Sequence, residues 1–203
     1  MLRRAPLERT PASHDRGHIL YVRSDRIGTR SVATGPSLSK LYRHGMIEAF
    51  WKRFVAATGI DGSYEAWAFG DPSLPDLATK LALLVRDGPK RATAGLASDY
   101  EDENEPLPEI GDLSVILDGE GAPVCVIRTT AIETRRFGDV DGAFAWDEGE
   151  GDRSLEWWRR AHLRFFERQG TPIDDDTLVV LEHFELLWPT PTESTKWGLD
   201  VPG

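Results

Sequence analysis

The apolar residues of the segment 46–188 change repeatedly between two spacings, and this alternation limits the folds open to the chain. A spacing of three to four residues, typical of a helix, appears first in Ile47, Phe50, Phe54 and Val55. A spacing of two residues, typical of a half-buried strand, appears later in Leu113, Val115 and Leu117. Because hairpin strands and helices are interspersed, we predict an α+β fold whose sheet curls into a β-barrel with flanking helices.

Turn and capping residues set the expected limits of the elements. Helices are predicted over 46–58, 73–87, 140–146 and 152–169, and strands over 64–69, 113–117, 124–132 and 177–187. Ser73 and Asp152 are the expected N-caps of two of these helices, and an acidic loop is expected over 99–109. The side chains expected to be buried are Leu81, Leu84, Val115, Leu117, Val126 and Val179 or Leu181.

Charge divides the chain unevenly. Residues 1–44 contain nine Lys or Arg against three Asp or Glu, whereas the whole chain has a formal net charge of −10. The remainder therefore carries −16, which disfavours binding of a long polyanion, since phosphate contacts depend on Lys and Arg. Residues 1–45 show no sustained periodicity and are predicted to be a disordered basic extension, either a non-native start or a nucleic-acid-binding arm. We expect one domain over 46–188 and a polar tail over 189–203.

Compartment and cofactor classes are narrowed by what the sequence lacks. Cys125 is the single cysteine, which excludes an internal disulfide and fits a reducing compartment. No apolar run approaches the length of a membrane span, so a cytoplasmic location is expected. The five histidines show no metal-ligand spacing, and an acidic cluster around residues 147–152 is expected to be a solvated loop. We therefore predict no metal and no cofactor.

Five segments together resemble the bacterial ASCH (activating-signal-cointegrator homology) proteins, which have a PUA-like β-barrel. They are Trp67-Ala68-Phe69-Gly70-Asp71, the segment 88–94 with its Gly-x-Lys-x-x-Thr core, Gly111-Asp112-Leu113, the strand 124–130, and the segment 148–155. The resemblance covers nearly all of residues 46–188. Relatives more often have threonine directly after the lysine, where this chain has Arg91.

The resemblance implies a function on RNA or on modified nucleosides. One characterised relative is an amidohydrolase that removes the acetyl group from acetylcytidine, and its lysine, threonine and glutamate match Lys90, Thr93 and Glu150 here. Another relative is assigned ribonuclease activity, and the family at large is described as RNA-binding. An amide hydrolase with a lysine-activated threonine is therefore expected, with a ribonuclease or a non-catalytic RNA- or ligand-binding module as alternatives. The expected partner is RNA or a modified nucleoside.

The chemistry expected of these three residues sets conditions on the structure. Thr93 supplies a hydroxyl nucleophile, which must be activated at neutral pH. Lys90, expected at a pocket rim, acts as base only if it is neutral, and burial would favour that form. Glu150 would shuttle a proton. The alternatives are a solvated lysine beyond a helix end, an ordinary strand threonine and a solvated carboxylate before a helix.

Four further residues are predicted to bind substrate. Arg128 interrupts an apolar strand and would either face the pocket, as a ligand for a carboxylate or phosphate, or point into solvent. Trp67 and Phe69 could stack on a nucleobase or pack in the core. Ser154 could contact substrate or support the start of a helix.

Overall fold

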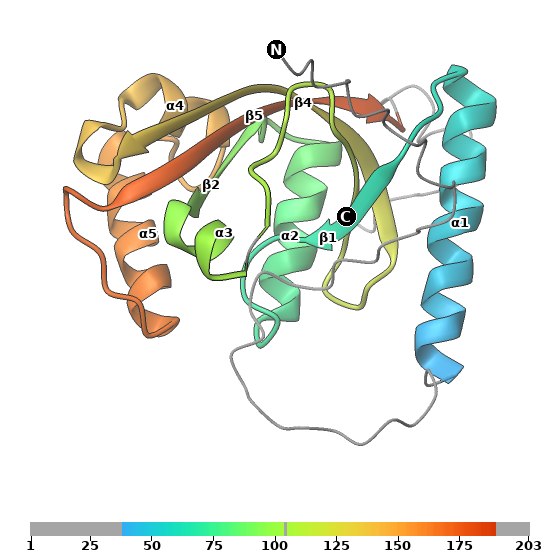
Figure 1. Ribbon diagram of the computed structural model, residues 1–203, viewed down its shortest axis with the longest axis horizontal. Helices are drawn as coiled ribbons and strands as arrows, with labels where there is room; N and C mark the ends of the chain where they lie inside the picture. The colour runs from blue at the N-terminus through green and yellow to red at the C-terminus, as the bar shows by residue number, and fades with distance from the viewer. Residues whose placement is uncertain (1–37, 104, 190–203) are drawn as a thin grey trace, which may run out of the picture.

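The computed structural model describes residues 38–103 and 105–189 (Figure 1). Its strands are β1 (Tyr64–Ala68), β2 (Ala92–Leu96), β3 (Leu113–Leu117), β4 (Pro123–Arg136) and β5 (Leu178–Trp188). Its helices are α1 (Leu38–Thr58), α2 (Pro75–Arg86), α3 (Ala97–Glu103), α4 (Gly142–Glu148) and α5 (Leu155–Arg168), with a short 3-10 helix, η1 (Phe137–Asp139). This mixture of helices and strands confirms the predicted α+β class.

Within the described residues, five strands form one mixed sheet in the order β1-β3-β4-β5-β2. β1 runs parallel to β3, and the other neighbouring strands are antiparallel. The β4–β5 ladder shifts register between Val126 and Ile127 and again between Thr129 and Ala131. Such irregularities bend a strand, and the long ribbon of β4 and β5 is visibly curved in Figure 1. Because β1 and β2 lie at the two edges, the barrel predicted from the sequence is a half-barrel that is open between these strands.

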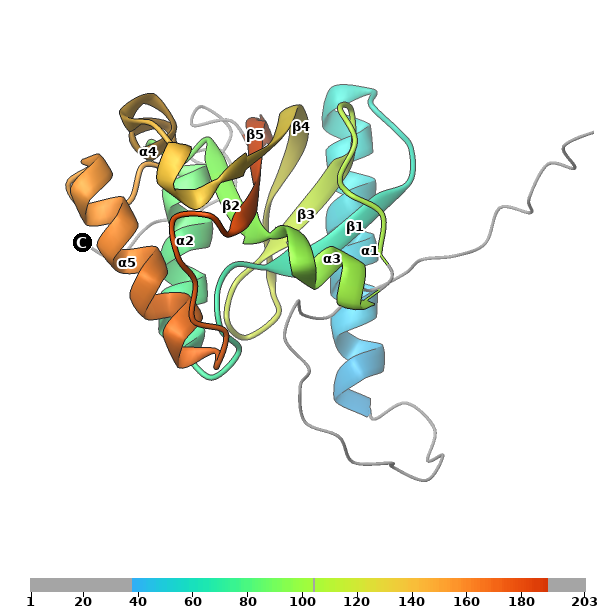
Figure 2. The same cartoon turned by 60° about the vertical axis from the view of Figure 1, so that its left-hand side comes forward.

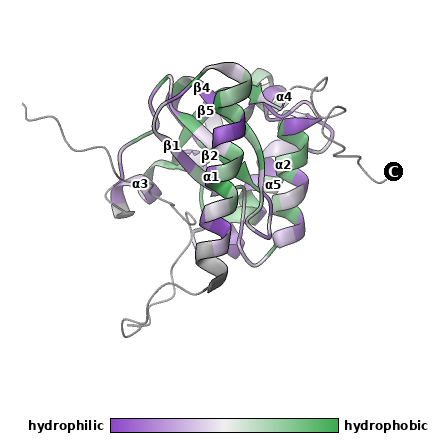
Figure 3. Ribbon diagram, turned by 90° about the vertical axis from the view of Figure 1, so that its right-hand side faces the viewer, coloured by the Kyte–Doolittle hydropathy of each residue, from purple (hydrophilic) through white to green (hydrophobic). Residues whose placement is uncertain are grey.

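The helices divide the sheet into three packed regions. α1 lies at one end of the sheet and α4 and α5 at the other, with α2 between them (Figure 1, Figure 2). α1 lies in the foreground of Figure 3. Its Glu48, Lys52 and Arg53 are exposed. Its buried Phe50 and Phe54 pack against β3 and β4. Each helix therefore hides its apolar side against a different part of the curved sheet.

Alternation along the strands separates two faces of the sheet. Val126 packs with Phe50 and Phe54 of α1, in what is called the α1 cluster below. The next residue, Ile127, packs with Leu81 and Val85 of α2, in the α2 cluster. The face that carries Ile116, Ile127 and Phe184 against α2 is called the α2 face below. On β2 and β5 the opposite face packs against α4 and α5, through Ala92, Ala94, Leu96, Val179 and Leu181.

Most of the predicted core is confirmed. Leu81, Val115, Leu117, Val126, Val179 and Leu181 are buried, and Leu84 is partly buried against the α2 cluster. No helix in the part of the chain that the structure describes is long and apolar enough to cross a membrane.

Four local expectations differ from the structure. α1 begins at Leu38 rather than near residue 46, and Arg43 of its extra turns lies against Gly121. The rest of the predicted N-terminal extension and the tail after Pro189 lie outside the described residues. Part of the expected acidic loop is helical, as α3. The N-cap of α2 is Leu74 instead of Ser73, and that of α5 is Ser154 instead of Asp152.

Candidate functional site

Lys90 stands between the end of α2 and the start of β2, and its side chain is buried between two carboxylates. Its Nζ donates a hydrogen bond to Glu150 Oε1 at 2.6 Å and lies 3.9 Å from Glu148 Oε2. Lys90 and Glu148 are each only 1% exposed, and the side chain of Glu150 is 18% exposed. The expectation of a lysine at a pocket rim is therefore wrong, since Lys90 lies inside the domain.

The loop that carries Glu150 is pressed against the backbone of Lys90. Gly149 ends α4 in the left-handed conformation, with φ of 73°. A Cβ at this position would lie 2.7 Å from the Lys90 backbone nitrogen and 2.8 Å from the Pro89 carbonyl carbon. In addition, the Arg91 backbone N–H donates to the Asp147 carbonyl at 2.7 Å. These contacts bring Glu148 and Glu150 to Lys90 across about sixty residues of sequence.

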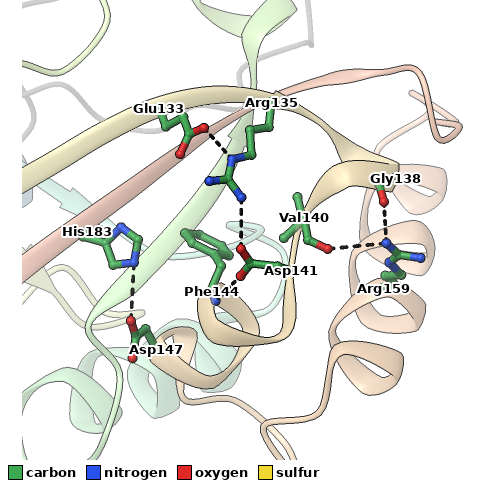
Figure 4. Close-up of polar contacts among 9 residues, drawn as sticks. All are labelled: Glu133, Arg135, Gly138, Val140, Asp141, Phe144, Asp147, Arg159 and His183. Carbon is green, nitrogen blue, oxygen red and sulfur yellow. Dashed lines mark hydrogen bonds and ion pairs between the residues drawn. The ribbon is translucent and has the colours of Figure 1, made fainter.

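Polar contacts at the far end of β4 hold α4 and α5 in place (Figure 4). Arg135 bridges Glu133 and Asp141, and Asp141 caps α4 by accepting a hydrogen bond from the Phe144 N–H. The side chain of Arg159 on α5 donates to the Gly138 carbonyl, also drawn in Figure 4. α4 and α5 therefore present Glu148 and the following loop to Lys90 from a fixed position.

We expect Gly149→Ala to disturb this loop much more than an alanine at an unconstrained glycine with the same backbone angle. Gly170 has φ of 78° and nothing within 4 Å of an added Cβ, so Gly170→Ala is the matched control. In both variants the alanine must adopt a left-handed backbone conformation, which costs about 1 kcal/mol of folding free energy. Only in Gly149→Ala must the new Cβ also displace the backbone of Pro89 and Lys90. Urea denaturation should show an additional loss of about 1–3 kcal/mol for Gly149→Ala. Equal losses in the two variants would show that the close approach does not constrain the loop.

His162 on α5 lies next to Glu148, and Glu150, Lys90, Glu148 and His162 are called the charged cluster below. Its Nε2 lies 3.4 Å from Glu148 Oε1, and its Nδ1 lies 3.0 Å from the carbonyl of Trp158. Both partners are acceptors, so the imidazole satisfies both contacts only when both nitrogens carry protons. Burial lowers the pKa of His162, but Glu148, Glu150 and the Trp158 carbonyl together outweigh this effect and the pKa is raised. His162 also stacks on the Trp158 ring, with centroids 4.2 Å apart.

The electrostatics of the cluster hold Lys90 in its charged form. Burial alone would lower the pKa of Lys90, but the carboxylates of Glu148 and Glu150 outweigh burial and its pKa is raised. Burial would raise the pKa of Glu148, but Lys90 and His162 hold it well below its ordinary value. Glu150, Lys90, Glu148 and His162 thus form a chain of alternating charge. This finding opposes the neutral lysine expected from the sequence.

Glu148 keeps one unsatisfied oxygen inside this cluster. Among the described residues, Glu148 Oε2 and the Trp158 indole nitrogen are buried without a hydrogen-bond partner. A buried carboxylate oxygen that lacks a hydrogen bond is costly, and the nearby charges of Lys90 and His162 offset part of that cost.

Thr93 lies on β2, where it pairs with Glu182 of β5. Its neighbours Ala92 and Ala94 face α4 and α5, so Thr93 is on the α2 face of the sheet. The Lys90 ammonium lies 5.2 Å from the centroid of Phe69, whose ring packs against Phe184 on this same face. Phe69 thus links Lys90 to the part of the sheet that carries Thr93.

The other predicted substrate-binding residues are placed differently. Trp67 packs edge-on against Phe69, with ring centroids 4.7 Å apart. Arg128 forms an ion pair with Glu185 and alternates with Ile127, so it lies on the face away from α2 and does not join Lys90. Ser154 caps α5 by accepting a hydrogen bond from the Trp157 N–H.

Three residues of this region were not predicted as site residues from the sequence: Glu148 and Glu182, which are buried, and His162, whose side chain is 14% exposed. Glu148 lies two residues before Glu150 inside the matching segment 148–155, and that proximity was the available indication. His162 and Glu182 lie in a helix and a strand that periodicity identified, but their alignment with Lys90 and Thr93 depends on tertiary packing.

A small cavity of about 80 Å³ opens beside this cluster, between the end of β1, the start of α2 and the β3–β4 turn. Trp67, Phe69, Asp71 and Pro75 are among its lining residues, but Lys90 and Glu150 are not. Phe69 therefore separates the cavity from the charged cluster. Among the described residues, no group of three or more His, Cys, Asp or Glu is arranged to hold a metal ion.

Comparison with known proteins places the chain and its fold in one family. The sequence model of the ASCH domain matches residues 65–188. The crystal structure of an ASCH domain from Lactobacillus crispatus JV V101 is 31% identical, with a TM-score of 0.64, and the alignment covers 71% of this chain and 96% of that chain. A protein from Enterococcus faecalis V583 is also 31% identical, with a TM-score of 0.63 and coverage of 79% and 98%. A comparison with curated proteins finds no match. The chain belongs to the ASCH domain family.

Proposed function

We propose that this ASCH-domain protein hydrolyses an amide-type bond on a modified nucleoside, with acetylcytidine as the representative substrate. The observation that carries the proposal is the buried contact of 2.6 Å between Lys90 Nζ and Glu150 Oε1. It joins two of the three residues that match the amidohydrolase relative, and β2 carries the third, Thr93, three residues after Lys90.

In this proposal Lys90 acts as a cation rather than as a base. Its raised pKa keeps the ammonium charged, which suits stabilisation of the negative oxygen that forms when Thr93 attacks an acyl group. Glu150, together with Glu148, holds the ammonium in position before substrate binds. A fixed charge in a buried site costs little reorganisation during the reaction.

The charge of the chain supports a small substrate over a long nucleic acid. The net charge of −16 on residues 45–203 repels a polyanion, whereas an acylated nucleoside carries no phosphate. Trp67, which is partly exposed and lines the small cavity that Phe69 separates from Lys90, offers a ring on which a planar base could stack.

The proposal predicts that purified protein releases cytidine from acetylcytidine and that Thr93→Ala abolishes the release. Loss of the nucleophile should lower kcat by about 10³-fold or more, whereas Thr93→Ser should keep part of the activity because the hydroxyl remains. Thr134→Ala, an exposed threonine of β4, is the matched control. Chromatographic separation of cytidine and acetylcytidine measures the rate.

Wild-type protein that fails to hydrolyse any acylated nucleoside would contradict the proposal. If the same protein binds the nucleoside without turnover, measured by calorimetry, the binding-module alternative gains support. If it instead degrades RNA and Lys90→Met abolishes that activity, the ribonuclease alternative replaces the hydrolase.

A further inference from the structure

We propose that Glu182 is the general base that takes the proton of Thr93, and that Thr129 holds the Glu182 carboxylate in position. This inference rests on the proposed amide hydrolysis and assigns the base within the same site. A base other than Lys90 is required because Lys90 is ion-paired to two carboxylates and keeps its own proton.

The register of β2 and β5 places the two groups side by side. Thr93 and Glu182 are Cα partners in the antiparallel ladder. Side chains at directly opposite positions project from the same face, with their Cβ atoms about 4.5–5.5 Å apart. A glutamate spans this distance, so its carboxylate has the reach to accept a proton from the Thr93 hydroxyl.

Both side chains face the region that contains Lys90. Glu182 alternates with Val179 and Leu181, which pack against α4 and α5, so it lies on the α2 face with Phe184. Phe184 contacts Phe69, and Phe69 contacts the Lys90 ammonium. Thr93 and Glu182 therefore share the face of the sheet that carries Phe184, and the rings of Phe184 and Phe69 connect this face to the Lys90 ammonium.

A buried hydroxyl orients the carboxylate. Thr129 Oγ1 on β4 donates a hydrogen bond of 2.6 Å to Glu182 Oε1, and Thr129 is only 2% exposed. Glu182 itself is 6% exposed. A carboxylate that is buried and held by a fixed donor is preorganised for proton transfer, as the partner of a nucleophile must be.

The reaction balances with these groups alone. The Thr93 hydroxyl proton moves to Glu182 as the Thr93 oxygen attacks the acyl carbon, and Lys90 faces the oxyanion that forms. The carbon–nitrogen bond then breaks, and the amine leaves with the proton from Glu182. Water attacks the Thr93 ester and gives its proton to Glu182, which returns it to the Thr93 oxygen when the ester bond breaks. The net change is amide plus water to acid plus amine.

Kinetics of Glu182→Gln on acetylcytidine test the assignment. Glutamine keeps the shape and still accepts from Thr129, but cannot take a proton, so kcat should fall about 10²–10⁴-fold with little change in KM. Glu182→Asp should recover part of the loss. Glu185→Gln, a neighbouring β5 carboxylate that pairs with Arg128 on the other face, is the matched control and should keep wild-type kcat.

Thr129→Val supplies a second test that does not remove the base. Losing the hydroxyl donor destabilises the charged carboxylate, so the acid limb of the kcat/KM profile should move to higher pH. An unmoved limb, or full activity in Glu182→Gln, would overturn the assignment. If wild-type protein and Thr93→Ala are equally inactive, the proposed hydrolysis itself fails. If the wild-type protein is active, Thr93→Ala is inactive and Glu182→Gln keeps full activity, the proposed hydrolysis stands and only the role of Glu182 fails.

Discussion

Replacement of Lys90 by methionine should lower the free energy of unfolding by about 3–5 kcal/mol, the range for breaking a buried ion pair by removing one partner. Methionine keeps the apolar stem of the lysine, so the loss comes mainly from the buried Glu148 and the partly buried Glu150, which are left without their cation. Urea denaturation at neutral pH measures the effect. The sequence alone favoured a rim lysine whose removal leaves the fold intact, and the buried position reverses that expectation.

A control and a rescue separate charge from packing. Lys80→Met changes an exposed lysine of α2 and should alter stability by less than about 0.5 kcal/mol. Lys90→Met combined with Glu148→Gln and Glu150→Gln removes the unpaired charges and should recover much of the loss. A Lys90→Met variant as stable as Lys80→Met would show that the buried network contributes nothing.

Periodicity predicted much of the fold because most of its elements bury one apolar side. The sequence of β3 alternates, β5 contains continuous apolar runs, and α2 and α5 have a helical stripe of apolar residues. β2 was not among the predicted strands. Its sequence, Ala92-Thr93-Ala94-Gly95-Leu96, is too short and has too few large apolar residues to show the two-residue spacing of a strand. The start of α1 was missed because its first turns lack apolar spacing and are held by contacts such as Arg43 against Gly121.

The site was predicted only in part, since its geometry depends on contacts between distant segments. The motif resemblance identified Lys90 and Glu150, which the structure places 2.6 Å apart. The burial of Glu148 depends on the docking of α4 and α5, and the pairing of Glu182 with Thr93 depends on strand register. The charge state of Lys90 could not be derived from its sequence neighbours, because both of its carboxylate partners come from about sixty residues away.

The pH dependence of catalysis should show that Lys90 works while protonated. A lysine that must be neutral would make kcat/KM rise about tenfold per pH unit, or about 100-fold between pH 7 and 9. We expect a change of less than about threefold over that range, because the pKa of Lys90 is raised above its ordinary value of 10.5. Initial rates on acetylcytidine, in buffers of constant ionic strength, check this.

The same pKa shifts set the pH window in which the network stabilises the fold. Because the folded-state pKa of Lys90 is raised, its contribution is fully present below 10.5 and is lost as the pH rises through the folded-state value. Because the folded-state pKa of Glu148 is lowered, its contribution is present above 4.5 and is lost as the pH falls through the folded-state value. The pH range from 7 to 9 lies inside both limits, so a change in rate there does not reflect unfolding of the site.

The protonation state of Lys90 is the central claim of this account, and nuclear magnetic resonance of the lysine side chains measures it directly. In protein labelled with ¹⁵N-lysine, the Nζ signal that disappears in Lys90→Met belongs to Lys90. We predict an ammonium signal, slow to exchange with water because the group is buried and hydrogen-bonded to Glu150, that keeps its chemical shift from pH 6 to 9. A shift to the neutral amine within that range would contradict the charged role of Lys90 and return it to the role of base.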